Sequence, residues 1–341
     1  MTDLSTPANE IFSDTGTGIP VSQSISEIIH EFIIERMPQP GQPLADAALH
    51  HFVAPGKMLR AKMALRAADF LKVDRTAALH WAVAIEVLHN ASLIHDDICD
   101  GDRLRRGRLA VWSAYGRDVA LTLGDWLVAL SFELAAEAAQ RSQTPMLVKI
   151  LATHMKTTTI GEAREFDVRP VKDWDHYLQG AGDKTAPLLT APLEGVAAMA
   201  LHGGAAPTIG DCFRALGNAY QIANDILNFS GGDGANTCGS DLGLRAPNGV
   251  VVLFRQSLDA ATKADFDNWY ASGSPEGLDL WVDELRRSPA LGEAARRMES
   301  LLDDATDYAD RLPAELVVVI TPIQQLLQQV CLKSVASLNK G

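Results

Sequence analysis

The chain has 341 residues, of which 47% are hydrophobic and 21% are charged, a composition typical of a globular protein rather than a disordered or fibrous one. Its formal net charge of −13 argues against non-specific binding to nucleic acid, because no excess of Lys and Arg is available to neutralise phosphates. If such a chain binds an anionic substrate, it must gather its few cations locally or recruit a metal ion.

The first residues and the cysteines indicate the cellular compartment in which the protein is found. Residues 1–20 are rich in Ser, Thr, Gly and Asp without hydrophobic periodicity, which predicts a flexible N-terminal arm. They lack a basic region followed by an apolar core, so we expect no secretory signal. We also expect no apolar run long enough to span a bilayer, because Asp125 and Glu133 interrupt the most apolar stretch, residues 119–136. Four widely spaced cysteines without a Cys-x-x-Cys pair favour reduced thiols, and the sequence therefore predicts a cytoplasmic protein.

Helical periodicity dominates after the arm. Apolar residues recur at helical spacing from Ile25 to Ile33, before a proline-rich break. Strand-like alternation is nearly absent, and the glycine-rich segment 230–249 is the clearest long loop, a feature that often acts as a lid. The pattern predicts one all-α domain over residues 21–341, a bundle of long helices with its sites on facing helices. Further helices are predicted at 57–72, 76–100, 117–140, 144–165, 173–201, 207–229, 250–271, 277–287, 290–310 and 314–337.

The strongest chemical signal is an aspartate motif that closes the apolar run 82–94. Asp96 and Asp100 are four residues apart and project from one face of a helix, with Asp97 beside them. Three carboxylates at a helix C-terminus repel one another and oppose the helix dipole, a cost that a bound cation would remove. Carboxylate, water and phosphate oxygens are the ligands that Mg²⁺ prefers. A solvated acidic helix end is the competing interpretation of this motif alone.

Cations gather close to this motif. Arg103, Arg105, Arg106 and Arg108 follow it directly, and guanidinium groups match phosphate oxygens in bidentate geometry. Earlier in the chain, the segment 56–60 carries Lys57 and Arg60 at the entry to a helix, where backbone N–H groups favour anions. The sequence thus predicts two phosphate-binding zones, one through a metal and one through direct cations, as a two-substrate diphosphate enzyme requires.

At these positions the chain resembles the trans-isoprenyl diphosphate (polyprenyl) synthases. The likeness extends from about residue 50 to 260, and several independent motifs occur in the family's order. The resemblance implies an isoprenoid-synthase-type bundle of long helices around a central apolar cavity, and a homodimer that pairs through central helices. The matching segments are 56–60, 89–107, Gly124-Asp125, Lys184-Thr185, 220–228 and 239–242.

The resemblance also implies a reaction, the condensation of an allylic diphosphate with isopentenyl diphosphate. Physical chemistry agrees, because charge builds on a departing diphosphate and preorganised metal and cations stabilise it. His89, Lys184 and Gln221 also have plainer interpretations as a core histidine, a turn lysine and a core amide. The implied roles are Mg²⁺ ligation by Asp96, Asp97, Asp100 and Asp225, contact with the allylic diphosphate by Arg105, Lys184, Thr185 and Gln221, and isopentenyl diphosphate binding by Lys57, Arg60, His89 and Arg106.

The second aspartate-rich motif departs from the family's pattern. Asn224 and Asn228 stand where carboxylates are expected, and an amide coordinates Mg²⁺ more weakly because it brings no charge. Downstream, Arg245 is a candidate substitute for an expected lysine. Three functions stay open: chain elongation with a weakened second metal site, terpene cyclisation, or a low-activity regulatory subunit. Because the cations expected for isopentenyl diphosphate are all present, we favour elongation.

Product length is predicted from the residues before the first aspartate. Ala91 and Ser92, five and four positions earlier, are small and lie more than one helical turn below the metal motif, where a growing chain would pass. Bulky residues there would stop elongation early. The sequence therefore predicts a product of C20 or longer, unless a deeper aromatic side chain blocks the path, and we take geranylgeranyl diphosphate as the expected product.

Overall fold

The computed structural model describes residues 24–54, 56–165, 173–230 and 238–338. These residues divide into two compact units, the N-terminal unit (24–155 and 188–206) and the C-terminal unit (156–187 and 207–338), and each is described by itself. Helices dominate both units, and one short hairpin is the strand content of the described residues, which confirms the predicted all-α class. The single domain over residues 21–341 stays a prediction, and the predicted arm at 1–20 lies outside the described residues.

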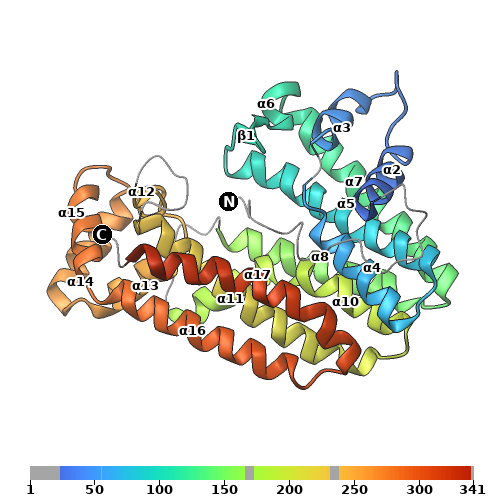
Figure 1. Cartoon of the computed structure of the whole chain (residues 1–341). Coiled ribbons are helices and arrows are strands. Elements are labelled where there is room, and N and C mark those ends of the chain that lie inside the picture. Colours follow the sequence, from blue (N-terminus) through green and yellow to red (C-terminus); the bar gives the residue numbers. More distant parts are fainter. Residues whose placement is uncertain (1–23, 55, 166–172, 231–237, 339–341) are drawn as a thin grey trace. The chain divides into compact units, whose positions relative to one another are not determined.

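The N-terminal unit is organised around α5 (Arg75–Cys99), which is buried along most of its length (Figure 1). The Asp74 side chain begins this helix by accepting a hydrogen bond from the Ala77 N–H at 2.8 Å. Its other elements are α2 (Ile25–Glu35), α3 (Ala45–Phe52), α4 (Leu59–Leu71), β1 (Leu104–Arg105), β2 (Arg108–Leu109), α6 (Val111–Tyr115), α7 (Arg117–Ser142), most of α10 (Pro187–Met199), η1 (Gly203–Ala205) and the first part of α8 (Met146–Glu165).

Glycines let two helices approach α5 closely. A Cβ atom on Gly124 of α7 would lie 2.1 Å from Nε2 of His95, and one on Gly195 of α10 would lie 2.1 Å from the Trp81 ring. A larger residue at position 195 would push α10 away from α5, because the Trp81 ring is fully buried and cannot withdraw, whereas one at position 124 would have to displace the partly exposed His95 ring. Gly124 therefore allows α7 to lie close to the end of α5 that carries the aspartate motif, and Gly195 allows α10 to lie close to its first part.

Two of the predicted long helices are each broken into two, and the C-terminal unit contains the second of them whole. The predicted helix 173–201 is interrupted at Ala186, because Pro187 has no backbone N–H to continue the ladder. The predicted helix 250–271 is interrupted at Asp259, whose side chain caps the helix that follows. The elements are α9 (Trp174–Thr185), α11 (Ala206–Ser230), α12 (Ser240–Leu244), α13 (Gly249–Ser257), α14 (Ala260–Ser272), α15 (Leu278–Arg287), α16 (Ala290–Ala309) and α17 (Ala314–Leu338) (Figure 1).

Three described helices are long and apolar enough to cross a membrane, by length and composition alone: α5, α7 and residues 314–332 of α17. The expectation that no run reaches this length is therefore wrong on these criteria, since two acidic residues do not interrupt the apolar window of α7. In α5, 83% of the apolar window is buried inside the protein, whereas the share is 44% in α7 and in α17. Burial in the core thus accounts for the apolar character of α5.

Candidate active site

The first aspartate motif occupies the last turn of α5, and its three carboxylates lie in different environments. Asp97 is 1% exposed, and both of its oxygens accept hydrogen bonds from Nε of Arg105, at 2.7 and 2.8 Å. Asp96 is half-buried and Asp100 is exposed. The backbone N–H of Asp100 still donates to the Asp96 carbonyl at 2.8 Å, so these two residues keep helical spacing on one face. The motif therefore offers two accessible carboxylates and one that is committed to an arginine.

Two accessible carboxylates are a fitting donor set for Mg²⁺ in this class of site. The described residues contain no group of three His, Cys, Asp or Glu side chains that could hold a metal by themselves. Mg²⁺ is usually bound by one or two carboxylates, with waters and substrate phosphate oxygens filling the other positions. Asp96 and Asp100 suit a metal ion that is bound together with a diphosphate.

The hairpin after α5 aims two arginines in different directions. Its strands pair Leu104 with Leu109 and Arg105 with Arg108, which leaves Arg106 and Gly107 as the two turn residues. Both have positive φ, 53° and 74°, as a type I′ turn requires. Glycine adopts this conformation freely, whereas for a residue such as Arg106 it costs roughly 1–2 kcal/mol. The tight turn allows Arg105 to reach Asp97 while its neighbour reaches another loop.

That loop precedes α4 and receives Arg106 closely. Its NH1 donates to the Ala54 carbonyl at 2.8 Å, and a Cβ atom on Gly56 would lie 2.6 Å from its NH2. A side chain at position 56 would displace the guanidinium, so glycine is required there. The contact joins the two cationic segments that the sequence separates by about 50 residues, the 56–60 loop and the arginine-rich hairpin.

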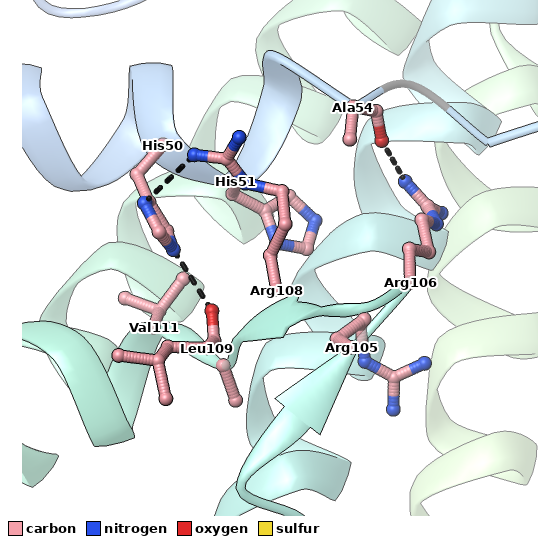
Figure 2. Close-up of a pocket in the computed structure, with 9 residues that line it drawn as sticks. His50, His51, Ala54, Arg105, Arg106, Arg108, Leu109 and Val111 are labelled. Carbon is pink, nitrogen blue, oxygen red and sulfur yellow. Dashed lines mark hydrogen bonds between the residues drawn. The ribbon is translucent and has the colours of Figure 1, made fainter.

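A pocket opens between α3, the hairpin and the start of α6 (Figure 2). His50 bridges the hairpin, because its Nε2 donates to the Leu109 carbonyl at 2.8 Å and Arg108 donates to its Nδ1 at 3.5 Å. Deeper, His51 donates from Nε2 to the Asn90 side-chain oxygen at 2.9 Å. The pocket is lined by His50, His51, Ala54, Arg105, Arg106, Arg108, Leu109, Ala110 and Val111.

The two buried histidines of this region are neutral at neutral pH. Burial lowers the pKa of His51 to about 4, with its hydrogen bond to Asn90 acting in the opposite direction and the nearby arginines adding to the effect. Burial and the charges of Arg60 and Arg106 likewise hold the pKa of His89 well below its ordinary value. The positive charge of the site therefore comes from arginine and lysine, and the imidazoles can serve as neutral hydrogen-bonding groups.

Among the predicted substrate residues, the environment of Lys57 is well suited to an anion. Its Nζ atom is buried and has no hydrogen-bond partner among the described residues. A buried ammonium without a partner is costly, and a phosphate oxygen would satisfy it. Gly56, which precedes Lys57 in the chain, contacts Arg106, and the charges of Arg60 and Arg106 both act on His89.

In the C-terminal unit, the predicted substrate residue Lys184 lies in a network of ion pairs at the end of α9. Lys184 Nζ is 2.9 Å from a Glu162 carboxylate oxygen, and the neighbouring Asp183 pairs with Arg164 at 3.1 Å and Arg214 at 3.0 Å. Close helix packing holds this end of α9. A Cβ atom on Gly161 would lie 2.3 Å from the Lys184 backbone nitrogen, and one on Gly217 would contact the Thr185 methyl at 3.4 Å.

The second motif is buried and fully hydrogen-bonded. Asp225 is 1% exposed and accepts from the Tyr177 hydroxyl at 2.6 Å, the Gly249 N–H at 2.6 Å and the Gln221 side chain at 3.1 Å. Burial, together with the charge of Asp241, raises the pKa of Asp225 to about 8. The predicted ligand Asp225 and the predicted substrate residue Gln221 are thus partners of each other in this structure.

The structure does not support Arg245 as the substitute for a missing lysine. Its guanidinium donates to the carbonyls of Leu242, Tyr270 and Ser274 at 2.6 to 3.1 Å. It also stacks 3.9 Å from the centre of the Trp269 ring. These contacts use the guanidinium to hold α12 against α14, so its role is structural.

The predicted residues fall into two groups, with Lys57, Arg60, His89, Asp96, Asp97, Asp100, Arg105 and Arg106 in the N-terminal unit and Lys184, Thr185, Gln221 and Asp225 in the C-terminal unit. Sequence reasoning missed His51, Tyr177, Asp241 and Asn248. The proximity of His51 to the 56–60 loop was a usable signal, and Asp241 lay within the matched segment 239–242 although no role was assigned to it. Nothing in the spacing of Tyr177 or Asn248 pointed to Asp225 or Asp241, because these contacts are tertiary.

Comparison with known proteins places this geometry in a family. The sequence model of the polyprenyl synthetase family matches residues 42–279. Heptaprenyl diphosphate synthase component 2 of Geobacillus stearothermophilus is 32% identical over 287 residues, which cover 80% of this chain and 84% of that protein. The geranylgeranyl pyrophosphate synthase of Geoglobus acetivorans is 31% identical over 296 residues, covering 82% and 88%.

Solved structures agree at the level of the fold. The decaprenyl diphosphate synthase of Rhodobacter capsulatus superposes with a TM-score of 0.73 and 23% identity, covering 92% of this chain and 94% of that one. The geranylgeranyl pyrophosphate synthetase of Pyrococcus horikoshii gives a TM-score of 0.75 at 24% identity, covering 90% and 95%. With the family match and the two relatives above, these findings confirm the resemblance: the chain belongs to the polyprenyl synthetase family of trans-prenyltransferases.

Proposed function

We propose that this enzyme condenses an allylic diphosphate with isopentenyl diphosphate, and that its product is geranylgeranyl diphosphate. The observation that carries the proposal is the buried, partnerless Nζ of Lys57 beside the Gly56–Arg106 contact. A cationic corner of this kind suits a second diphosphate that is bound without metal, which elongation needs and cyclisation does not. Relatives with both geranylgeranyl and longer-chain names support C20 or longer products.

The residues of the N-terminal unit divide the work as follows. Lys57, Arg60 and Arg106 bind the diphosphate of isopentenyl diphosphate, and neutral His89 donates a hydrogen bond to it. Asp96 and Asp100 hold Mg²⁺, which would supply positive charge to the departing allylic diphosphate. Arg105 faces the same leaving group and is oriented by its hydrogen bonds to Asp97. In this proposal Asp97 acts through Arg105 rather than as a direct metal ligand.

In the C-terminal unit, the residues that the family resemblance assigns to the allylic diphosphate are Lys184, Thr185 and Gln221. Lys184 adds a cation to the leaving diphosphate as its bond to carbon breaks, and preorganised charge of this kind stabilises the negative charge that develops. A dry apolar pocket protects the resulting allylic cation from water. Ala91 is fully buried and Ser92 is half-buried on α5, so neither fills space below the aspartates as an aromatic residue would.

Product analysis by mass spectrometry tests this proposal. The enzyme is incubated with Mg²⁺ and farnesyl diphosphate, with and without isopentenyl diphosphate, and we expect geranylgeranyl diphosphate only when both substrates are present. A hydrocarbon or alcohol formed without isopentenyl diphosphate would establish a cyclase, and no product in either mixture would establish an auxiliary subunit. Lys57→Gln should raise the KM for isopentenyl diphosphate alone, whereas the exposed Lys72→Gln serves as the matched control.

We further propose that the enzyme is a cytoplasmic homodimer. Less than half of the apolar window of α7 is buried, and Leu121 on this helix is 42% exposed. An apolar helix that its own chain leaves partly uncovered is a candidate for contact with a second copy of the chain. Light scattering after size exclusion should give twice the chain mass, and Leu121→Glu should reduce it while the exposed Leu280→Glu does not. A monomer that gains mass only with a second type of chain would contradict the homodimer.

A further inference from the structure

We propose that the second motif, residues 224–228, holds no metal ion in this enzyme and instead forms a hydrogen-bonded latch that fixes the segment 239–251 to α11. The proposal goes beyond the proposed activity and does not depend on which product is made. It rests on what each polar group of this region contacts in the C-terminal unit.

One half of the latch is Asp225. Its Oδ2 accepts from both the Tyr177 hydroxyl and the Gly249 N–H, and its Oδ1 accepts from Gln221. Gly249 is what allows this arrangement, because a Cβ atom there would lie 2.7 Å from the Tyr177 ring. Asp225 thus ties α9 and the first residue of α13 to α11. All three of its partners are neutral hydrogen-bond donors, and they occupy the oxygens that a metal ion would use.

The other half of the latch is built on Asp241. Its two oxygens each accept from a different amide, Oδ1 from Asn228 at 3.1 Å and Oδ2 from Asn248 at 2.9 Å. The Asn228 side-chain oxygen accepts from the Asp241 N–H in return, at 3.3 Å. Asn248 then caps α13 with its own oxygen, which accepts from the N–H groups of Val250 and Val251. Asp241 therefore joins α11 to the start of α13 through two neutral amides.

The amide at position 228 is essential to this geometry. A carboxylate there would place two anionic oxygens about 3 Å apart in a buried site, and such a pair persists only when a cation or a proton lies between them. The Asn228 NH2 group takes the place of that cation, because it donates a hydrogen bond to the Asp241 carboxylate. Because Asn224 and Asn228 bring no charge and the carboxylates of Asp225 and Asp241 already have donors, a metal ion would have to break the latch to bind.

Manganese titration followed by electron paramagnetic resonance counts the bound ions without using turnover. We expect the wild-type enzyme to bind Mn²⁺, with and without inorganic diphosphate, and the double variant Asp96→Asn/Asp100→Asn to bind none. Adding Asp225→Asn to that variant should therefore change nothing. A saturable Mn²⁺ signal that survives Asp96→Asn/Asp100→Asn and disappears with Asp225→Asn would overturn the proposal. Failure of the elongation assay would leave this count unaffected.

Thermal unfolding gives an independent reading. Asn228→Asp should unfold at lower temperature than wild type in EDTA, because it sets two carboxylates against each other. Adding Asp241→Asn should recover the loss, since one donor and one acceptor again face each other. If Asn228→Asp alone is too unstable to purify, the recovery of stability in the double variant still tests the latch. A single variant as stable as wild type without metal, or a double variant no more stable than the single one, would refute the latch.

Discussion

The pair formed by Asp97 and Arg105 makes the sharpest prediction about the first motif. Asp97 is 1% exposed and the Arg105 side chain 15% exposed, so solvent screens their interaction little. Removing one partner of a buried pair leaves an uncompensated charge and costs about 3–5 kcal/mol. Arg105→Gln should therefore lower the free energy of unfolding by this amount. For a domain of 150 to 250 residues, that corresponds to a fall in Tm of roughly 6–20 °C.

A double-mutant cycle separates this cost from ordinary loss of packing. Asp97→Asn combined with Arg105→Gln leaves two neutral amides that can hydrogen-bond, so the double variant should be more stable than Arg105→Gln alone. The coupling energy should reach about 1–3 kcal/mol, as for other side chains in direct contact. Urea denaturation with an unchanged m-value is the assay.

Additive single effects would refute the reasoning, because they would mean that the two groups do not depend on each other. The cycle also tests the role of Asp97 in the site. If Asp97 held a metal ion rather than Arg105, Asp97→Asn would not be destabilising in EDTA, since removing one of three repelling carboxylates would then relieve charge.

Three further outcomes are expected. Asp96→Asn and Asp100→Asn should each reduce kcat by at least about a hundredfold with unchanged far-UV circular dichroism, because each removes one accessible carboxylate for Mg²⁺; near-normal turnover would contradict their role. Lowering the pH from 7 to 4 should reduce the free energy of unfolding by about 3 kcal/mol through His51 alone. The pKa of His51 is about 4 in the folded protein and lies below its value in the unfolded chain. The stability that is present above the unfolded pKa is therefore lost as the pH falls. His51→Gln, which keeps a donor for Asn90, should flatten this slope in denaturation curves, and an equal slope would exclude His51 as its source. Ser92→Phe should shorten the main product by mass spectrometry if the growing chain passes below the aspartates, and an unchanged product would refute that path.

Sequence patterns predicted the long helices well and the short ones poorly. The helix at 76–100 was predicted to within one residue at each end, because its apolar run is long and Asp74 supplies a cap. Neither α3 nor α6 was predicted, since helices of eight and five residues carry too few turns to show a period. The break at Ala186 was missed although Pro187 was visible and marks the start of a new helix, because the helical pattern continues on both sides of it.

The sequence indicated which residues belong to the site but not which of them contact one another. Spacing alone placed Asp96 and Asp100 on one face of a helix, because four residues make about one turn. It gave no reason to separate Asp97 from them, since its partner Arg105 is presented by a hairpin whose turn the sequence analysis did not identify. The same limit applied to Asn228: an amide in place of a carboxylate was visible, but its contact with Asp241 depends on the packing of α12 against α11.

The two units present their cations to a diphosphate at different electrostatic cost. Lys184 lies 2.9 Å from Glu162, so a phosphate that contacts this ammonium must share it with a carboxylate. Lys57 Nζ has no hydrogen-bond partner among the described residues, so a phosphate there satisfies a buried charge and displaces nothing. Binding should therefore gain more per contact at Lys57 than at Lys184. In the proposed roles, one diphosphate would meet the buried ammonium of Lys57, and the other would compete with Glu162 for the ammonium of Lys184.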